Sequence, residues 1–324
     1  MSLNQICRDL KKYNNFLITA HTSPEGDALG SVLGFYNLIK KLGKQAVIII
    51  DDRLPYGYDF LPGARHIRRL NTGMKYPKFD CLVVLDCADL KRTGGVHKLN
   101  RQNQPVMNID HHISNQFFGE TNWVDAQASS CSEMIYKLYK QLRLTLDRDS
   151  ALVLYTGIMT DTGSFRYSNT AVSTFNAAAE LLKFGVNVAQ VYRYTYENIP
   201  APEAKLLLKI LSKIKFFGHG QIAAFEISPE SSGSKKTRID LADQALSFGR
   251  AIQGVEAVVL FRKILKSKSQ VRVNLRSQGR VDVNKIAAFF KGGGHKTAAG
   301  CTVFGKLPAV RSKVIAKICR ALRK

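Results

Sequence analysis

The sequence has no closely spaced cysteine pair, no long apolar run and few acidic residues. Its 324 residues include six cysteines, which are scattered and form no Cys-x-x-Cys pair. This distribution predicts reduced thiols rather than a disulfide framework or a cysteine-based zinc site. No apolar stretch is long enough to span a bilayer, and the N-terminus shows no basic segment followed by an apolar one. We therefore expect a soluble, cytoplasmic protein that has no membrane partner.

The scarcity of acidic residues is concentrated in the C-terminal part. The whole chain has 48 Lys and Arg against 25 Asp and Glu, for a formal net charge of +23. Residues 1–203 hold 23 basic and 19 acidic side chains, whereas residues 204–324 hold 25 and 6, a net charge of +19. This asymmetry predicts a polyanionic partner for the C-terminal part, with a merely solvated basic surface as the alternative.

Hydrophobic periodicity predicts an α/β protein with two sheets. Short apolar runs separated by helical patterns are typical of a parallel sheet. The predicted strands are 15–20, 45–50, 81–86 and 105–110, and the predicted helices are 27–41, 130–142, 149–160 and 171–184. Further along, alternating residues predict a mixed sheet with strands at 221–227, 257–262 and 270–275. The helices predicted around this second sheet are about 240–249, 282–290 and 308–322.

Two domains follow from this pattern. We place the first at residues 1–190 and a smaller α/β domain at residues 205–324. Two prolines, Pro200 and Pro202, mark residues 191–204 as the linker. The segments predicted as exposed loops by composition are 231–236 and 266–269.

Three predicted strands end next to histidine and acidic residues, which are types of side chain that can bind metal ions. His21 follows the first strand, with Glu25 and Asp27 just beyond it; Asp86 ends another, and Asp110-His111-His112 ends a third. Open parallel sheets place their chemistry outside the carboxyl ends of the strands, so these side chains are expected in one crevice. A turn or capping role is the alternative for any single residue. Several carboxylates together are costly unless a cation neutralises them, and this ligand set suits a divalent metal such as Mn²⁺.

Six segments of the chain resemble, in order, the motifs of the DHH phosphoesterase superfamily and of its DHH-associated C-terminal domain. The segments are His21–Ser31, Leu85–Asp89, Asp110–His112, Thr160–Thr170, Val273–Ser277 and Gly292–Gly300. The resemblance covers nearly the whole chain, and the nearest subfamily is that of the NrnA-type nano-RNases and pAp phosphatases. It implies a parallel-sheet DHH domain and a smaller α/β domain with a mixed sheet, with the active site in the cleft between them.

The resemblance also implies a site with two divalent metal ions, Mn²⁺ or alternatively Mg²⁺. It assigns His21, Glu25 and Asp86 to one ion and Asp27, Asp86, His111 and Asp161 to the other, so that Asp86 bridges them. The implied catalytic residues are Asp86, Asp110, His111 and His112. We expect His112 to face the substrate phosphate, or to support the metal ligands from behind, rather than to bind a metal directly. Glu25 departs from the family pattern, which has Asp at this position.

A second set of residues is implied to hold the far phosphate of the substrate. It comprises Arg276, Ser277, Gly292, Gly293, Gly294 and His295. Glycines let the backbone approach a phosphate closely, although a glycine triplet is equally typical of turns. An arginine binds a phosphate with two parallel hydrogen bonds.

The implied activity is hydrolysis of short RNA oligonucleotides and of 3′-phosphoadenosine 5′-phosphate (pAp). The runner-up is a phosphodiesterase acting on cyclic di-AMP or linear pApA. A RecJ-like single-strand exonuclease fits less well, and a non-catalytic nucleotide sensor would need a broken set of metal ligands. The expected partners are short RNA or nucleotide phosphates, and a homodimer is an open alternative to a monomer.

Overall fold

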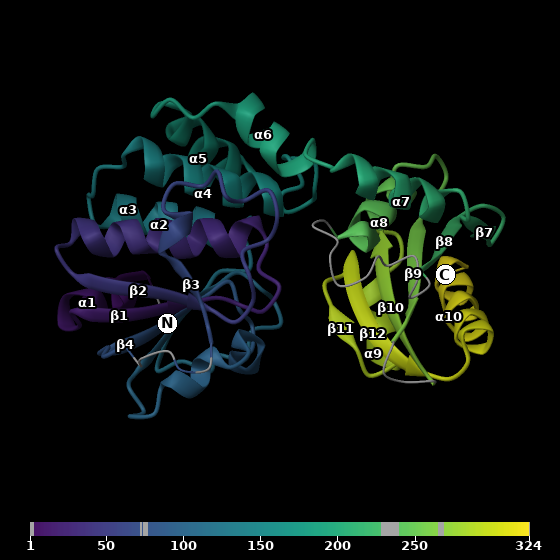
Figure 1. Ribbon diagram of the computed structural model, residues 1–324, viewed down its shortest axis with the longest axis horizontal. Helices are drawn as coiled ribbons and strands as arrows, with labels where there is room; N and C mark the ends of the chain where they lie inside the picture. Colours follow the sequence, from purple (N-terminus) through teal and green to yellow (C-terminus); the bar gives the residue numbers. More distant parts are fainter. Residues whose placement is uncertain (1–2, 72, 74–76, 228–239, 265–268, 324) are drawn as a thin grey trace. The chain divides into compact units, whose positions relative to one another are not determined.

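The computed structural model describes residues 3–71, 73, 77–227, 240–264 and 269–323. The chain divides into two compact units, Met1–Asn198 and Ile199–Lys324. Each unit is built on its own six-stranded sheet (Figure 1). The predicted α/β class, with a parallel sheet followed by a smaller domain with a mixed sheet, is confirmed.

Sheet A of the first unit is entirely parallel, in the order β3-β2-β1-β4-β5-β6. Its strands are β1 (Asn15–Thr19), β2 (Gln45–Ile50), β3 (Ile67–Arg69), β4 (Cys81–Leu85), β5 (Val106–Asp110) and β6 (Thr121–Val124). The helices are α1 (Leu3–Lys12), α2 (Gly26–Lys41), α3 (Cys131–Gln141), α4 (Arg148–Asp161), α5 (Val172–Leu182) and α6 (Val188–Tyr196). Short 3₁₀ turns form η1 (Ala64–His66), η2 (Leu90–Thr93) and η3 (Val96–Leu99). The strand order reverses between β1 and β4, which makes that crevice the expected binding place in such a sheet.

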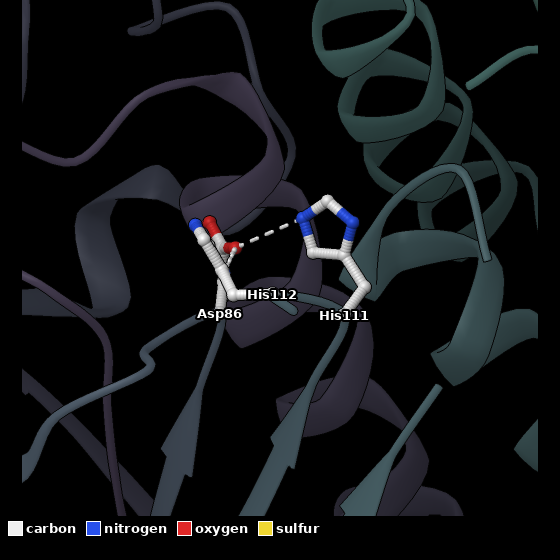
Figure 2. Close-up of side chains that lie close together, drawn as sticks. All are labelled: Asp86, His111 and His112. Atoms are coloured by element: carbon white, nitrogen blue, oxygen red, sulfur yellow. Dashed lines mark ion pairs between the residues drawn. The ribbon is translucent and has the colours of Figure 1, made fainter. Parts of the chain in front are cut away.

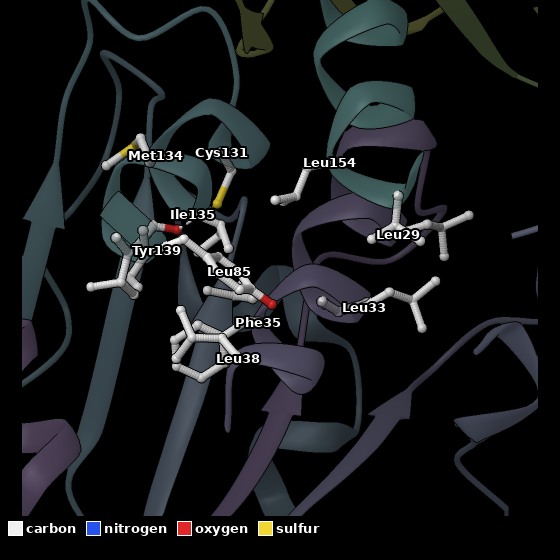
Figure 3. Close-up of a cluster of buried hydrophobic side chains, with 14 of the residues drawn as sticks. Leu29, Leu33, Phe35, Leu38, Leu85, Cys131, Met134, Ile135, Tyr139 and Leu154 are labelled. Carbon is white, nitrogen blue, oxygen red and sulfur yellow. Dashed lines mark hydrogen bonds between the residues drawn. The ribbon is translucent and has the colours of Figure 1, made fainter. Parts of the chain in front are cut away.

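Helices α2, α3 and α4 pack together over one face of sheet A (Figure 3). Leu29 and Leu33 of α2 contribute to this core with Leu85 of β4, and all three are fully buried. The opposite face packs against residues of η2 and η3. Because the central strands are covered on both faces, they read in the sequence as continuous apolar runs.

Sheet B of the second unit has the order β11-β12-β10-β9-β8-β7. Its strands are β7 (Lys215–Phe217), β8 (Ile222–Ile227), β9 (Ala257–Lys263), β10 (Gln270–Ser277), β11 (Gly293–Gly294) and β12 (Ala298–Phe304). The helices are α7 (Ala201–Leu211), α8 (Leu241–Arg250), α9 (Val283–Phe289) and α10 (Leu307–Leu322). Strands β8 and β9 pair in parallel and the other neighbours pair antiparallel. Helices α7 and α8 cover one face of the sheet, and α9 and α10 cover the other.

The structure corrects some local predictions. The boundary between the two units, after Asn198, lies within the linker predicted at 191–204, but helices occupy both ends of this segment, because α6 continues to Tyr196 and α7 begins at Ala201. Pro202 lies in the first turn of α7, where proline is tolerated because its missing N–H would be unpaired anyway. Strand β11 lies within the glycine triplet Gly292–Gly294, a pattern that is also typical of turns. The predicted loop at 231–236 lies outside the described residues, as does most of 266–269.

All six cysteines carry free thiols, and four of them are buried. None of the described helices combines the length and the apolar character that crossing a membrane requires.

Candidate metal centre and active site

The topology of sheet A brings the predicted residues to one edge. Strands β1, β4 and β5 are adjacent, and their carboxyl ends carry His21, Asp86 and Asp110–His112. Helix α2 begins just after β1 and supplies Asp27, and helix α4 ends at Asp161. This edge includes the point between β1 and β4 where the strand order reverses.

Asp86 lies at the centre of the cluster (Figure 2). Its Oδ2 is 3.4 Å from His21 Nε2, and its Oδ1 is 3.5 Å from His111 Nε2 and 3.7 Å from His112 Nδ1. The side chain is buried, and the backbone has a φ of 52°, a left-handed conformation that is uncommon for residues other than glycine. Such strain persists where the surroundings hold the residue firmly, and it is frequent at functional sites.

Two further carboxylates approach the same imidazole. His111 Nε2 is 3.9 Å from Asp27 Oδ2 and 3.7 Å from Asp161 Oδ2. Asp27 is held in place because its oxygens accept hydrogen bonds from Cys131 N at 2.7 Å and Ser132 N at 2.8 Å. These two N–H groups belong to the first turn of α3, which has no intrahelical partners for them.

Burial and mutual charge shift the ionisation of the cluster. Burial and the charge of Asp86 raise the pKa of Asp27 to about 6, and burial also raises the pKa of Asp161. Burial opposes ionisation of Asp86 as well, but its interactions with His111 and His21 outweigh it and hold its pKa well below the usual range. Burial lowers the pKa of His111, whereas its interaction with Asp86 and the charge of Asp161 raise it, with a net pKa well above its usual value.

These side chains fit a divalent cation. Asp86, His111 and His112 each offer a ligand atom, and the three atoms lie within 4.8 Å of one another. Among the residues that the structure describes, buried Asp86 Oδ1 has no hydrogen-bond donor, so this oxygen in the centre of the cluster keeps a lone pair for a cation. Carboxylate oxygens with imidazole nitrogens are ligands that Mn²⁺ and related metals take.

A buried chain of hydrogen bonds supports His112. His112 Nδ1 is 2.7 Å from Asp110 Oδ1, and Asn115 Nδ2 donates to Asp110 Oδ2 at 2.6 Å. Asn115 Nδ2 also donates to Asn108 Oδ1 at 2.8 Å, and Asn108 is anchored to the backbone of β4. Asp110 is thus fully buried with a partner at each oxygen, and it orients His112 rather than facing the cluster directly.

The roles of His112 and Glu25 stay predictions. A ring nitrogen of His112 lies close enough to Asp86 and His111 for the three residues to hold a metal ion, beside its expected place facing the substrate phosphate or supporting the ligands. Glu25 is the exposed N-cap residue of α2 and makes no side-chain capping hydrogen bond. Its role as a metal ligand stays a prediction.

Asn169 is a positioning residue that the sequence reasoning missed. Its Nδ2 donates to Asp161 O at 3.1 Å, to Asp161 Oδ2 at 3.3 Å and to Ser129 O at 2.9 Å. Between the two residues the chain turns sharply, with positive φ at Gly163, Ser164 and Phe165. The sequence offered one signal, since Asn169 lies inside the segment that resembles a family motif.

The predicted substrate residues lie in the second unit. Arg276 on β10 is partly buried and donates to Asp243 Oδ1 at 3.0 Å. Ser277 is fully buried, and its hydroxyl donates to Val281 O at 2.7 Å, so the hydroxyl is already used within the fold. His295 is exposed, and its backbone N–H donates to Ala298 O at 2.7 Å. A substrate role for these residues stays a prediction.

The glycine triplet is part of a strand pair rather than an open loop. Gly293 and Gly294 pair with Gly300 and Ala299 of β12. A Cβ on Gly292 would lie 2.3 Å from Gly300 O, and one on Gly294, which has a φ of 146°, would lie 2.4 Å from Ala298 O. These two glycines are therefore required by the close approach of the backbone segments, and Gly293 is the one with open space around its Cα.

Comparison with known proteins identifies the family. The model of the DHH family N-terminal domain matches residues 15–158, and that of the DHHA1 domain matches residues 221–323. The chain belongs to the DHH family. As a DHH phosphoesterase it is a hydrolase of phosphate esters, a class that uses divalent metal ions.

Relatives in the DHH family align with most of this chain. The "Bifunctional oligoribonuclease and PAP phosphatase NrnA" of Thermus thermophilus is 34% identical over 89% of this chain and 84% of its own length. The Bacillus subtilis protein of the same name is 27% identical over 93% of both chains. An exopolyphosphatase-related protein from Bacteroides fragilis has the same fold, with a TM-score of 0.90 at 24% identity over 99% of this chain and 97% of its own.

Proposed function

We propose that this DHH-family protein is a Mn²⁺-dependent phosphoesterase that hydrolyses short RNA oligonucleotides and removes a phosphate from pAp. The observation that carries the proposal is Asp86 Oδ1, which is buried among carboxylates and imidazoles and has no hydrogen-bond donor among the described residues. The names of the relatives from Thermus thermophilus and Bacillus subtilis support the choice of substrates.

The metal assignment follows the family pattern and this geometry. His21, Glu25 and Asp86 would hold one ion, and Asp27, Asp86, His111 and Asp161 would hold the other. When bound there, the ions would supply the means to activate a water as nucleophile and to stabilise the negative charge of the phosphoryl group. His21 is oriented for this task because its Nδ1 contacts Thr22 O at 2.7 Å, which directs Nε2 toward Asp86.

The remaining residues of the site position the substrate. We assign His112 a contact with the phosphoryl group being hydrolysed, because Asp110 holds its Nδ1 and directs the opposite side of the ring outward from that bond. In the second unit we assign the other phosphate of the substrate to Arg276, His295 and the exposed Gly293. Gly292 and Gly294 shape the strand pair that presents Gly293, and Ser277 braces the turn that follows Arg276.

The cellular setting is part of the proposal. Six free thiols fit a reducing compartment, so we place the enzyme in the cytoplasm. Light scattering of the purified protein tests whether it is a homodimer or a monomer.

The proposal is tested by comparing substrates and metals side by side. Purified protein is incubated with a dinucleotide RNA, pAp or cyclic di-AMP, each with Mn²⁺, Mg²⁺ or EDTA. We expect the dinucleotide and pAp to be hydrolysed, fastest with Mn²⁺ and not at all in EDTA. Preferential cleavage of cyclic di-AMP would favour the cyclic dinucleotide phosphodiesterase, and activity that persists in EDTA would contradict the metal mechanism.

A further inference from the structure

Strand β10 presents a polar row on one face of sheet B. Its residues alternate strictly between buried and partly exposed. The buried ones, Val271, Val273 and Leu275, join the core beneath α9 and α10. Arg272, Asn274 and Arg276 therefore point to the opposite face, because successive side chains of a strand alternate.

An arginine on the neighbouring strand lies directly beside this row. Arg262 of β9 is the registered partner of Arg272, and Thr302 of β12 is its partner on the other side. Directly opposite residues in antiparallel strands have Cα atoms about 4.5–5.5 Å apart and side chains on the same face. Arg262 and Arg272, here called the arginine pair, thus place two like charges side by side, which is unfavourable unless an anion joins them.

Besides Glu203, five Asp and Glu side chains are described in this unit, and these five have identified partners elsewhere. Glu226 pairs with Arg311 and Lys215, Glu256 with Arg280, Asp243 with Arg276, and Asp282 with Lys285, while Asp240 caps α8. Within the described residues, none of these carboxylates forms an ion pair with the arginine pair. The excess of basic side chains in residues 204–324 thus includes two neighbouring arginines that form no ion pair with a carboxylate of the described part of the unit.

Gly300 leaves room for one of these guanidinium groups. A Cβ at Gly300 would lie 2.9 Å from Arg272 Nη2 and 3.3 Å from Arg272 Cζ. The guanidinium therefore lies against the bare backbone of β12, which restricts its motion. Holding a cation in one place reduces the entropy lost when an anion binds.

We propose that the arginine pair binds an internal backbone phosphate of a single-stranded oligoribonucleotide. The inference rests on the proposed function and adds a binding site for an internal phosphate of the RNA to the sites for its terminal phosphates. Arg272 and Arg276 are four residues apart on one strand, which corresponds to about 13 Å at the usual rise per residue. Anion sites spaced along a strand in this way suit a chain with repeated phosphates, so the arginine pair contributes to RNA longer than a dinucleotide and not to pAp.

The binding test uses a fluorescently labelled RNA pentanucleotide in EDTA, where it is not hydrolysed. Anisotropy titrations at several salt concentrations compare the wild type with Arg272→Gln and Arg262→Gln. The control is Arg320→Gln, which removes the same charge from the exposed side of α10, a helix that packs against the other face of sheet B. We expect each of the two pair variants to bind about five- to tenfold more weakly and its salt slope to fall by about 0.7, the loss of one phosphate contact.

Two further variants separate the contact from general charge and folding effects. Arg272→Lys keeps the charge and should restore most of the affinity. Gly300→Ala keeps both arginines but displaces the guanidinium of Arg272, so it should weaken binding as well. Equal weakening by Arg320→Gln, or unchanged affinity in both pair variants, would overturn the inference in favour of diffuse electrostatics.

Kinetics distinguish this inference from the proposed function. With Mn²⁺, Arg272→Gln should raise KM for the pentanucleotide and leave the hydrolysis of pAp unchanged. If the wild type hydrolyses RNA and pAp but Arg272→Gln shows the same length dependence, only the inference fails. If the wild type hydrolyses neither substrate, the proposed function fails, and the anisotropy data still decide whether the arginine pair binds RNA.

Discussion

Charged side chains are arranged in opposite ways at the carboxyl edge of sheet A and on the face of sheet B that carries Arg262 and Arg272. At the first, carboxylates and imidazoles are buried together, and Asp86 contacts three histidines. On the second, Arg262 and Arg272 are neighbours with at least partial exposure and without an ion pair to the described carboxylates. A buried cluster of mixed sign suits a small, strongly charged ion, whereas an accessible row of one sign suits an extended polyanion.

The two regions are also held in shape by different means. In the first unit, buried side-chain hydrogen bonds from Asn115 and Asn169 fix Asp110 and Asp161. In the second, strand register places Arg272 beside Arg262, and a glycine clears the space for it. Substitutions in the first unit should therefore reduce turnover, and those on sheet B should mainly reduce affinity.

The largest effect is expected for Asp86→Asn. The amide keeps the shape but removes the charge shared by the two proposed metal sites, so kcat should fall by about 10³-fold or more. Asp89→Asn is the control, because Asp89 caps η2 with a hydrogen bond to Lys91 N and stays outside the cluster. Steady-state rates with Mn²⁺ and calorimetric Mn²⁺ titration measure the effect. Wild-type turnover in Asp86→Asn would contradict the proposal that catalysis takes place at the carboxyl edge of sheet A.

A smaller loss is expected for Asn115→Ala. Removing the amide leaves Asp110 Oδ2 buried without its donor, which should lower the free energy of unfolding by about 1–3 kcal/mol. His112 would lose its firm support, and activity should fall by about 10- to 100-fold. Asn122→Ala is a matched control: Asn122 is also buried, but its hydrogen bonds go to Gly119. If both variants lose stability and activity in parallel, Asn115 is structural only.

Metal affinity should depend on pH. Without metal, the raised pKa values mean that Asp27, with a pKa of about 6, and His111 are partly or fully protonated near neutral pH. Binding a cation must displace the proton of His111 and, below about pH 6, that of Asp27 as well, so Mn²⁺ affinity should fall with falling pH by about tenfold per pH unit for each proton displaced. Mn²⁺ titrations between pH 5.5 and 8.5 in buffers of different ionisation enthalpy measure this release. An affinity that does not change across this range would exclude these groups as ligands.

The smallest effect is expected for Arg276→Gln. If Arg276 only binds a phosphate, KM should rise by about tenfold while kcat changes little. Asp243→Asn tests the same contact from the other side, because it releases Arg276 from its ion pair and should not raise KM. Rates on pAp over a range of concentrations separate the two constants. A fall in kcat as large as the rise in KM would contradict the view that residues of sheet B serve binding and not turnover.

Much of the candidate site followed from sequence because it depends on strand ends. Apolar runs predicted β1, β4 and β5, and parallel strands necessarily place their ends at one edge. His21, Asp86 and His111 could thus be grouped before their distances were known. Short strands such as β3 and the glycine-bearing β12 were not predicted, because their apolar pattern is too short or is interrupted by glycine.

Local pattern by itself determined the class of fold, the strand ends and the uneven charge of the chain, because periodicity and composition are properties of neighbouring residues. Only the tertiary structure showed that Asn169 holds Asp161, that Ser277 is turned into the fold and that Arg262 lies beside Arg272. Each of these contacts joins side chains through buried geometry or strand register. Such contacts form when distant segments pack, and no spacing along the chain records them.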